Sequence, residues 1–197
     1  MGVNSKARAL APLLLSMAII IVDQLAKLAV ARLIPTGRIA WTAFDDFFWL
    51  VHQKNTGAAF SIGDSMPEFA RVAILILMPL ALLVGLCIYM LGTDELSGLQ
   101  RWAVGGIIGG GIGNIIDRIF RPEGVIDFLS FKFYGLFGLE RWPTFNVADS
   151  AVVVFGILLV VAGFFIPVVH PESQGNDQGQ GQKISREQGQ VDGKPSP

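Results

Sequence analysis

Four apolar stretches, each close to the length of a membrane-spanning helix, dominate the hydrophobic pattern of this chain. They run from about Leu10 to Leu33, Phe69 to Leu91, Leu99 to Ile119 and Val147 to Val169. A helix needs ~20 mostly apolar residues to cross the hydrocarbon core of a bilayer. The pattern therefore predicts a mainly α-helical integral membrane protein with four transmembrane helices and both termini on one side. Pro79 inside the second stretch is compatible with a membrane helix, where neighbouring groups satisfy the freed carbonyl.

The long connections between these stretches have a different pattern. Trp41 to Val51 is aromatic and β-branched, which favours a strand, so we expect a small extramembrane β-sheet at about residues 37–65. Asn55-Thr56-Gly57 has the composition of a turn, and Ala58-Ala59-Phe60 is expected to begin a short interfacial helix. The connection from about Phe120 to Phe145 is rich in aromatic residues. We expect it to pair with the sheet or to rest among lipid headgroups.

The apolar pattern stops near residue 170, which divides the chain into two parts. Residues 1–170 are predicted to form the membrane domain. Residues 171–197 are rich in Gln, Gly and charge, and they are predicted to form a disordered polar tail because they cannot offset their ordering entropy by burial. Within the domain, the segment Phe131 to Trp142 carries Gly135 and Gly138 and is expected to be a flexible insertion.

Composition supports the membrane class and excludes several others. The chain of 197 residues is 52% hydrophobic and 16% charged, with a mean hydropathy of +0.54, whereas soluble domains are typically ~25% charged. A net charge of -1 gives no basic surface for nucleic acid, so we expect no nucleic-acid partner. Cys87 has no second cysteine to pair with, and His52 and His170 are far apart in the chain. We therefore expect no metal site and no cofactor.

The first apolar stretch is predicted to be a retained helix and not a cleaved signal peptide. Lys6 and Arg8 precede it, and Ala29-Val30-Ala31 mimics a cleavage site. However, Asp23 and Lys27 lie just before that site, where a signal peptide is normally uncharged. The long connections carry slightly more Lys and Arg than the opposite side. Because the first helix often dominates orientation, Lys6 and Arg8 nevertheless favour a cytoplasmic N-terminus.

Ionisable and amide side chains gather at one end of the predicted helices. Such groups cost several kcal/mol at membrane depth, which makes them functional candidates. A cytoplasmic N-terminus brings the ends of the first and third helices and the start of the fourth to the outer face. The polar residues there are Asp23, Lys27, Asn114, Asp117, Arg118, Asn146 and Asp149, with Asp127 in the connection between the third and fourth helices. We expect these residues to converge.

Asp127 and Asp149 are candidates for a catalytic carboxylate pair. Two neighbouring acids cannot both ionise easily, so one pKa rises and the other stays low. The ionised member takes a proton from water as the water attacks a peptide carbonyl, while the protonated member supports the oxygen of the tetrahedral intermediate. Suitable donors to hold such a pair are Asn114, Asn146 and Arg118.

Simpler structural roles remain open for the same residues. They are an intrahelical ion pair for Asp23 and Lys27, snorkelling to water for Asp117 and Arg118, a helix cap for Asp149 or Ser150, and ordinary loop or turn positions for Asp127, Asn55, Asp45 and Asp46. The glycine ladders Gly105-Gly109-Gly113 and Gly106-Gly110 favour close helix packing. They would also leave room for an extended peptide or a lipid.

Five motifs of the chain together resemble the lipoprotein signal peptidase family, also called signal peptidase II. In order they are VDQLAK, KNTGAAFS, GGGIGNIIDR, VIDF and WPTFNVADS, and the resemblance extends from about Asp23 to Ala151. It implies a multi-pass aspartyl peptidase of the bacterial inner membrane that removes signal peptides from prolipoproteins just before a diacylglyceryl-modified cysteine. It also implies an active site near the outer face, both termini in the cytoplasm, contact with membrane lipids, and inhibition by globomycin-type cyclic peptides. We expect a monomer.

The resemblance also implies roles for individual residues. Asp127 of VIDF and Asp149 of FNVAD match the catalytic dyad of the family. The positions that match its supporting polar residues are Asp23, Asn55, Asn114, Asp117, Arg118 and Asn146, and Lys27 and Gly57 fall within matching motifs.

Two other functions are weighed against the peptidase. In a small proton-coupled transporter or channel, Asp23, Asp117 and Asp149 would relay protons. However, these acids gather at one end of the helices, and the sequence has no visible inverted repeat. In a structural or assembly protein, the Gly-rich third helix would bind a partner helix, which leaves the paired aspartates without a role.

Overall fold

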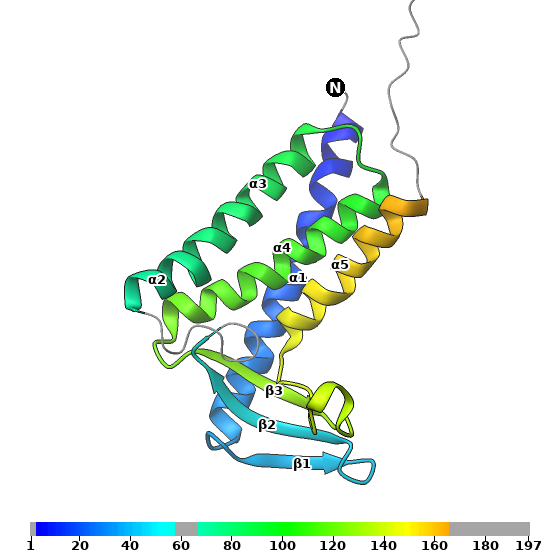
Figure 1. The fold of residues 1–197 in the computed structure, drawn as a ribbon. Coiled ribbons are helices and arrows are strands. Elements are labelled where there is room, and N and C mark those ends of the chain that lie inside the picture. Colours follow the sequence, from blue (N-terminus) through cyan, green and yellow to red (C-terminus); the bar gives the residue numbers. More distant parts are fainter. Residues whose placement is uncertain (1–2, 58–66, 166–197) are drawn as a thin grey trace, which may run out of the picture.

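The computed structural model describes residues 3–57 and 67–165, which form a bundle of long helices with a β-sheet at one end (Figure 1). Four helical segments are long and apolar enough to cross a membrane, namely Leu10–Leu33, Glu68–Gly92, Gly98–Phe120 and Val147–Phe165. Together with the three-stranded sheet, they confirm the predicted fold class. The interfacial helix expected at Ala58–Phe60 and the polar tail lie outside the described residues.

The second membrane-spanning segment combines three helical elements. α2 (Glu68–Val72) continues into a π-helix (Ala73–Leu77) and then into α3 (Met78–Gly92). Pro79 lies in the first turn of α3, but because α3 continues the preceding helix, the missing N–H of the proline interrupts the helical hydrogen-bond pattern. The π-helical turn immediately before it changes the hydrogen-bond spacing, so the helix accommodates the proline without ending.

α4 (Gly98–Phe120) is the central helix of the bundle and contacts α1 (Val3–Leu33), α3 and α5 (Val147–Phe165). It begins with a capping box in which the Ser97 hydroxyl accepts from the Gln100 backbone N–H at 3.3 Å and the Gln100 side chain accepts from the Ser97 N–H at 2.9 Å. It ends just before Pro122, which cannot continue a helix. Since α4 meets helices on three sides, its packing determines how closely the bundle closes.

The glycine ladders of α4 form those helix contacts. A Cβ atom added at Gly105 would lie 2.5 Å from the Pro12 carbonyl oxygen of α1, and one at Gly110 would lie 2.4 Å from the Ala148 carbonyl oxygen of α5. Only a residue without a side chain permits such a close approach of two backbones. The packing interpretation of the ladders is therefore confirmed.

The outer faces of the bundle are apolar. Leu14 of α1 and Leu82 of α3 are each 69% exposed, and Phe164 of α5 is 83% exposed. In a soluble protein such a surface would be a large aggregation-prone patch. On helices of membrane-spanning length it is the surface that lipid chains cover.

The sheet consists of β1 (Ile39–Ala43), β2 (Phe48–Asn55) and β3 (Val125–Phe131), antiparallel and in that order. The prediction of one continuous strand from Trp41 to Val51 is wrong, because a turn divides it. Phe44, Asp45 and Asp46 adopt φ values of 54°, 53° and 67°, and aspartate tolerates this left-handed region better than most residues. The Phe47 N–H closes the turn on the Phe44 carbonyl at 3.1 Å.

β3 belongs to the connection between α4 and α5, which settles how that connection is used. It pairs with β2 over Phe48 to Asn55, so Asp127 lies on a strand and the interpretation as an ordinary loop acid is wrong. Ile126 and Phe128 pack against Val30 and Ile34 at the end of α1. This apolar cluster fixes the sheet to the end of the bundle.

Beyond β3 the chain forms a projecting hairpin, residues Lys132 to Arg141, which we call the aromatic hairpin. The Phe133 N–H donates to the Glu140 carbonyl at 2.8 Å, and a short 3-10 turn, Leu136–Gly138, forms the tip. Gly135 and Gly138 adopt φ values of 78° and 77°, conformations that favour glycine. The expected insertion is thus a hydrogen-bonded hairpin, and its flexibility stays a prediction.

Candidate active site

The structure joins the predicted polar residues into one connected network where α1, α4, α5 and the sheet meet (Figure 1). Every member makes at least one polar contact with another member. The members are Asp23 and Lys27 from α1, Asn55 and Gly57 at the end of β2, Asn114, Asp117 and Arg118 from α4, Asp127 from β3, and Asn146 and Asp149 at the start of α5. The convergence inferred from helix ends is therefore present in three dimensions.

Lys27 is the buried cation at the centre of the network. Its side chain is 0% exposed, and its Nζ lies 2.8 Å from Asp23, 3.0 Å from Asp117 and 2.9 Å from Asn114 Oδ1. An ammonium has three donors, and all three are used. The predicted ion pair of Asp23 and Lys27 is confirmed, and it coexists with the contacts to α4. A buried charge requires such full pairing, because an unpaired one is very costly.

Asp117 is buried as completely as Lys27, so the interpretation that it snorkels to water is wrong. Its Oδ2 also accepts the Ile126 backbone N–H at 3.2 Å, and its Oδ1 accepts from Gln24 Nε2 at 3.0 Å and from Arg121. One carboxylate thereby links α1, the end of α4 and the start of β3.

Gln24 and Arg121 are network residues that the sequence analysis missed. Gln24 lies in the same VDQLAK motif as Asp23, and Arg121 follows Asp117 at i+4, a spacing typical of helical ion pairs. Both signals were available in the sequence. They were weak because Gln24 carries no charge, and because Arg121 lies after the end of the third predicted apolar segment.

Two asparagines hold the two candidate catalytic carboxylates. Asn114 Nδ2 donates to Asp149 Oδ1 at 2.6 Å, and Asn146 Nδ2 donates to Asp127 Oδ1 at 2.7 Å. The Asn146 backbone N–H donates to Asp149 Oδ2 at 3.1 Å. Asn146 therefore contacts both acids, and the two carboxyl groups lie on either side of one residue.

Asp149 also caps α5. Its backbone N–H donates to Asn146 Oδ1 at 2.9 Å while its carboxylate accepts the Asn146 N–H, which is the reciprocal geometry of a capping box. The capping interpretation is confirmed for Asp149, and it coexists with the position beside Asp127. The positive end of the helix dipole favours a negative charge there.

Asp127 lies on β3 with only 3% of its surface exposed. Asn55 Nδ2 donates to its Oδ2 at 3.0 Å. Burial, followed by the nearby charge of Asp149, raises the pKa of Asp127 from 3.8 to about 7, although hydrogen bonds from Asn55 and Asn146 and the charge of Lys27 act in the opposite direction. A raised pKa beside a second carboxyl group is the pattern expected of a proton-sharing pair.

Asn55 and Arg118 lie at the open side of the network. Asn55 Oδ1 accepts the Gly57 N–H at 3.1 Å, which confirms its turn role, while its amide nitrogen reaches Asp127. Arg118 Nη2 contacts the Gly57 carbonyl at 3.4 Å, and its Nε is buried without a partner among the described residues. The guanidinium therefore has an unused donor beside the carboxylates.

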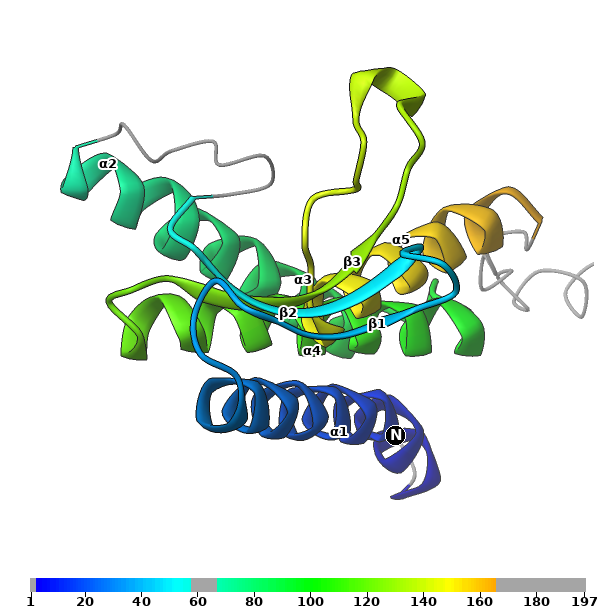
Figure 2. The ribbon, with the colours of Figure 1, turned by 90° about the horizontal axis from the view of Figure 1, so that it is seen from below.

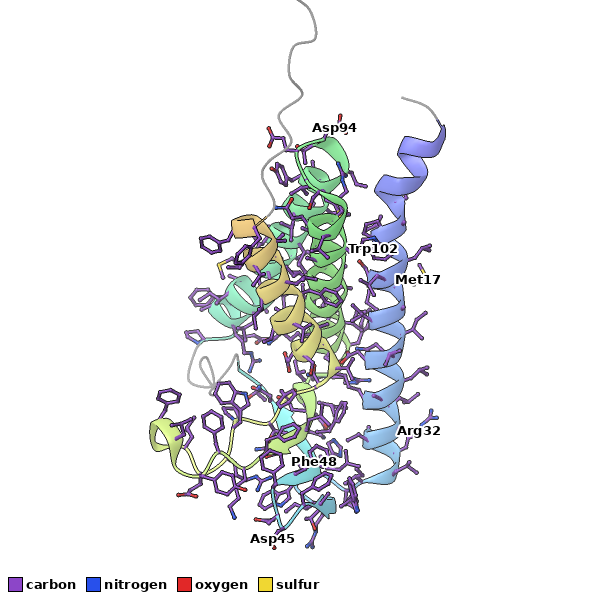
Figure 3. All side chains as sticks on the ribbon, turned by 90° about the vertical axis from the view of Figure 1, so that its right-hand side faces the viewer. Met17, Arg32, Asp45, Phe48, Asp94 and Trp102 are labelled. Carbon is purple, nitrogen blue, oxygen red and sulfur yellow. The ribbon has the colours of Figure 1, made fainter. Side chains whose placement is uncertain are left out.

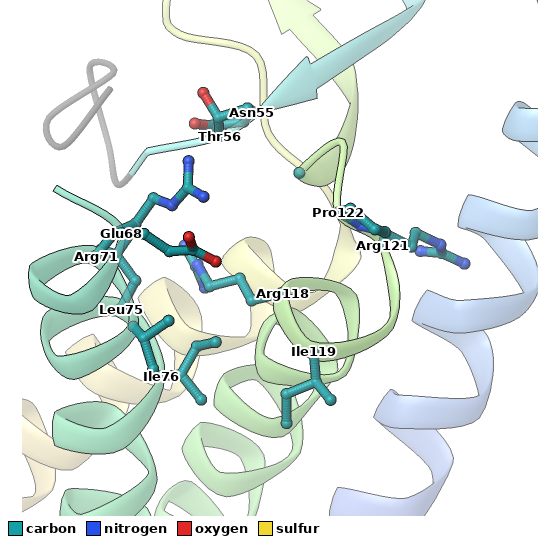
Figure 4. Close-up of a pocket in the computed structure, with 12 residues that line it drawn as sticks. Asn55, Thr56, Glu68, Arg71, Leu75, Ile76, Arg118, Ile119, Arg121 and Pro122 are labelled. Atoms are coloured by element: carbon teal, nitrogen blue, oxygen red, sulfur yellow. The ribbon is translucent and has the colours of Figure 1, made fainter. Parts of the chain in front are cut away.

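Two cavities meet at Asn55 and Thr56. The first, of about 250 Å³, lies between α2, the π-helix and the end of α4, and Arg71, Leu75 and Arg118 contribute to its walls (Figure 4). The second, of about 390 Å³, lies over β2 and β3, and its lining includes Asp127 and Trp142. Asp127 thus faces a space large enough for a short extended peptide, bordered by the cavity that contains Arg118.

The donor set of the network favours acid–base chemistry. No group of three or more His, Cys, Asp and Glu side chains within residues 3–57 and 67–165 is arranged to hold a metal ion. The carboxylates of Asp23 and Asp117 are already occupied by Lys27 and backbone donors. Asp127 and Asp149 are the network acids that share Asn146 as a donor, and Asp127 lines a cavity.

Comparisons with known proteins agree with this picture. The model of a family described as signal peptidase (SPase) II matches residues 15–165. The chain is 44% identical over 151 residues to a lipoprotein signal peptidase of Treponema pallidum, covering 77% of this chain and 81% of the relative. It is 45% identical over 158 residues to a lipoprotein signal peptidase of Treponema denticola, covering 80% of this chain and 91% of the relative.

Two solved structures share the fold. Both are described as bacterial membrane enzymes studied by the in meso method, and each aligns with a TM-score of 0.65 over 77% of this chain. The alignments cover 86% and 91% of those chains at 24% and 22% identity. At this identity the likeness concerns the architecture alone.

Proposed function

This chain belongs to the signal peptidase II family, and from that premise we propose that it is an aspartic endopeptidase that removes signal peptides from bacterial prolipoproteins, cleaving before a diacylglyceryl-modified cysteine. A membrane peptidase follows from the family itself. The aspartic mechanism is supported chiefly by one observation, that Asn146 donates both to Asp127 and to Asp149. No other function discussed above gives these two acids a reason to be adjacent.

In the proposed mechanism the shared proton lies mainly on Asp127. Its pKa of about 7 leaves Asp127 protonated in a substantial share of the molecules at neutral pH, whereas a carboxyl group with the ordinary pKa of 3.8 would be almost fully ionised. Asp149 lies at the N-terminus of α5 and accepts from Asn114 and from the Asn146 backbone, so donors and the helix dipole surround its ionised form. The two carboxyl groups titrate as a pair, and a single proton distributed in this way prepares them for complementary roles.

The hydrolytic step uses both members of the pair. Asp149 takes a proton from a water molecule as the water oxygen attacks the scissile carbonyl, and protonated Asp127 donates to the carbonyl oxygen of the tetrahedral intermediate. When the C–N bond breaks, protonated Asp149 gives its proton to the departing amine nitrogen, and a hydroxyl group of the intermediate returns a proton to Asp127, so the pair regains its single proton. The Arg118 guanidinium, which lines the first cavity, is placed to bind a polar group of the substrate.

The location of the pair suits a lipid-modified substrate. Asp149 lies in the first turn of a membrane-spanning helix, whereas Asp127 lies on the sheet outside the membrane-spanning segments. The scissile bond next to a lipid-anchored cysteine would be held near the bilayer surface. We infer that the apolar helix faces receive the acyl chains while the cavity over β2 and β3 receives the polypeptide.

The test is a gel-shift cleavage assay with the purified full-length protein in lipid and a diacylglyceryl-modified prolipoprotein. We expect Asp127→Asn and Asp149→Asn each to lower the cleavage rate by about 10³-fold or more. Asp45→Asn, an exposed acid on the far turn of the sheet, is the matched control and should cleave like wild type. The same substrate without its diacylglyceryl group should be cleaved far more slowly.

Several outcomes would contradict the proposal. Full activity in both dyad variants would move the catalytic acids elsewhere, and equal cleavage of the unmodified substrate would remove the lipid requirement. Absence of cleavage by the wild type, together with proton flux in proteoliposomes, would favour the transporter alternative.

Further elements of the proposal concern the surroundings of the enzyme. We place the chain in the bacterial inner membrane as a monomer, with both termini in the cytoplasm and the network near the outer face. A globomycin-type cyclic peptide is expected to occupy the same cavities as the substrate and to inhibit cleavage competitively.

A further inference from the structure

The tip of the aromatic hairpin is apolar and largely exposed, although the Tyr134 ring stacks on Phe47 with centroids 6.4 Å apart and the Phe137 ring lies 6.3 Å from that of Phe133. Tyr134, Leu136 and Phe137 are 69%, 54% and 85% exposed. They belong to one tight turn in which Tyr134 and Phe137 adopt φ values of 54°. Left-handed backbone at a bulky aromatic residue is unfavourable, so the fold holds these side chains outward at a conformational cost. A large exposed apolar cluster usually marks an interaction surface.

The base of the hairpin is fixed to the sheet. Lys132 and Arg141 each lie 3.8 Å from Asp46 on the β1–β2 turn. The Arg141 guanidinium stacks 3.5 Å above the Trp49 ring, and its Nη1 donates to the Asp46 carbonyl at 2.9 Å. Since ion pairs and stacking hold the base against the sheet, the tip projects in a defined direction.

That direction leads toward the surrounding bilayer. The hairpin lies level with the last turns of α1 (Figures 1 and 3), and α1 is still within its membrane-spanning segment as far as Leu33. Leu33 itself is 79% exposed, an apolar side chain that lipid would cover if α1 spans the bilayer to this point. Seen from below, the hairpin extends beyond the helices on the side opposite α1 (Figure 2).

We propose that the tip of the aromatic hairpin inserts into the headgroup region of the adjacent leaflet and anchors the sheet to the membrane surface. Aromatic side chains with one polar end are favoured at this depth, and Tyr134 fits that description. The apolar surface of the helices and the tip then form one continuous lipid-facing boundary. The occupant is the bilayer itself and not a second polypeptide.

The anchor has a consequence for the active site, which rests on the proposed function. The segment that returns from the hairpin carries Trp142, Pro143 and Thr144, and these residues line the cavity that contains Asp127. Holding the tip in the headgroups fixes the height of this wall above the bilayer. We infer that the anchor aligns the cavity with a scissile bond whose distance from the membrane is set by the lipid on the substrate.

Spin-label accessibility tests the membrane contact without reference to activity. In a Cys87→Ser background, a nitroxide is attached at Phe137→Cys, and the full chain is reconstituted in phosphatidylglycerol–phosphatidylethanolamine liposomes. The Phe137 label should collide more with lipid-soluble oxygen and less with a water-soluble nickel chelate. Asp45→Cys, at the far end of the sheet (Figure 3), is the matched control and should show the opposite preference.

A Phe137 label with the same accessibility as the Asp45 label would overturn the proposal. Protection of the Phe137 label only after a prolipoprotein is added would also overturn it and would assign the tip to substrate binding. Neither result depends on whether the protein cleaves its substrate, so a failure of the anchor is distinguishable from a failure of the peptidase proposal.

Cleavage in two environments tests the functional consequence. The double variant Leu136→Ser/Phe137→Ser should lower the initial cleavage rate roughly three- to tenfold in liposomes and leave it unchanged in detergent micelles. The single variant Phe137→Trp, which keeps an interfacial aromatic side chain, should cleave in liposomes at the wild-type rate. An equal loss in micelles and liposomes, or no loss in liposomes, would overturn the anchoring role.

Discussion

At the scale of single residues, the orientation of two amide side chains determines the site. Asn114 Oδ1 accepts from Lys27 Nζ at 2.9 Å and from Asn146 Nδ2 at 3.1 Å, so its Nδ2 must point to Asp149. Asn146 Oδ1 accepts from the Asp149 N–H, so its Nδ2 must point to Asp127. A buried ammonium and a helix cap thus fix the direction of both amides, and the two carboxylates receive donors.

The pKa of Asp127 leads to a prediction about pH. The active pair carries one proton, so cleavage should decline as the pH rises through about 7, where Asp127 loses it. Since the hydrogen bond from Asn55 lowers that pKa, Asn55→Ala should move the alkaline limb of the rate profile to higher pH while reducing the maximal rate. Initial cleavage rates between pH 5 and 9 measure this. Asp45→Asn, remote from the pair, should leave the limb unchanged.

Stability gives an independent check on the same pKa. A carboxyl group whose folded-state pKa is raised contributes stability that is fully present below its unfolded pKa, and this contribution is lost as the pH rises through the folded value. Wild type should therefore lose thermal stability between about pH 4 and pH 7 relative to Asp127→Asn, which cannot ionise. The Tm of Asp127→Asn minus the Tm of wild type should therefore increase from pH 4 to pH 7. A constant or decreasing difference would contradict the raised pKa.

At the scale of elements, glycines decide whether the helices can bring the network together. Asn114 and Asp149 belong to α4 and α5, and these helices approach so closely that Gly110 nearly touches the Ala148 carbonyl. The amphipathic pattern of a helix does not predict how closely two helices approach. A glycine at the contact does predict a close approach, because the absence of a side chain permits the two backbones to meet.

Gly110→Ala should therefore destabilise the protein by about 1–3 kcal/mol through overpacking. It should also lower activity, since it pushes apart the helices that carry Asn114 and Asp149. Gly85→Ala in α3 is the matched control, because nothing lies within 4 Å of the added Cβ. Thermal unfolding in detergent measures both variants, and a Tm of Gly110→Ala no lower than that of Gly85→Ala would contradict the close-packing argument.

The sheet shows a second principle at this scale. β3 is short and buried, and it carries Asp127 between Ile126 and Phe128, which pack against α1. The Asp46 carboxylate, predicted to be only a solvated loop charge, instead holds the hairpin base through Lys132 and Arg141. Charges on short turns acquire such roles only when two connections far apart in the sequence are brought together.

At the scale of the whole molecule, the distribution and pairing of charged residues bear on how the protein is oriented in the membrane. Cations on the sheet side slightly outnumber those on the opposite side, which by itself disfavours a cytoplasmic N-terminus. Many of the former are paired in the structure. The pairs are Lys54 with Glu123, Arg121 with Asp117, and Lys132 and Arg141 with Asp46. Arg101 on the opposite side is likewise paired with Asp94, so the cytoplasmic N-terminus stays a prediction that rests on Lys6 and Arg8 before the first helix.

Orientation is testable with two residues at opposite ends of the molecule, Asp45 on the sheet and Asp94 in the α3–α4 turn (Figure 3). In a Cys87→Ser background, Asp45→Cys should react with a membrane-impermeant maleimide in cells whose inner membrane is intact. Asp94→Cys should react only after the inner membrane is made permeable. The reverse labelling pattern would place the sheet and the network on the cytoplasmic side and contradict the proposal.

The membrane-spanning helices, the polar helix ends and the family could all be predicted from the sequence. Apolar length and isolated charges in apolar segments have strong, local energetic consequences, and they are visible without knowledge of any contact. The same local reasoning identified Asp23, Lys27, Asn114 and Asp149 as candidates. It failed for the strand predicted from Trp41 to Val51, because a turn divides a segment whose composition favours a single strand. It also failed for Gln24, whose role depends on a partner far away in the sequence.

Only the tertiary structure decided which of these groups touch. Sequence spacing places Asn114 and Asp149 on different helices and Asp127 in a long connection. Their hydrogen bonds depend on the close approach of α4 to α5 and on the pairing of β3 with β2. Contacts between segments far apart in the chain are determined by packing of the whole molecule, and the properties of such contacts, including the raised pKa of Asp127, exist only once that packing is complete.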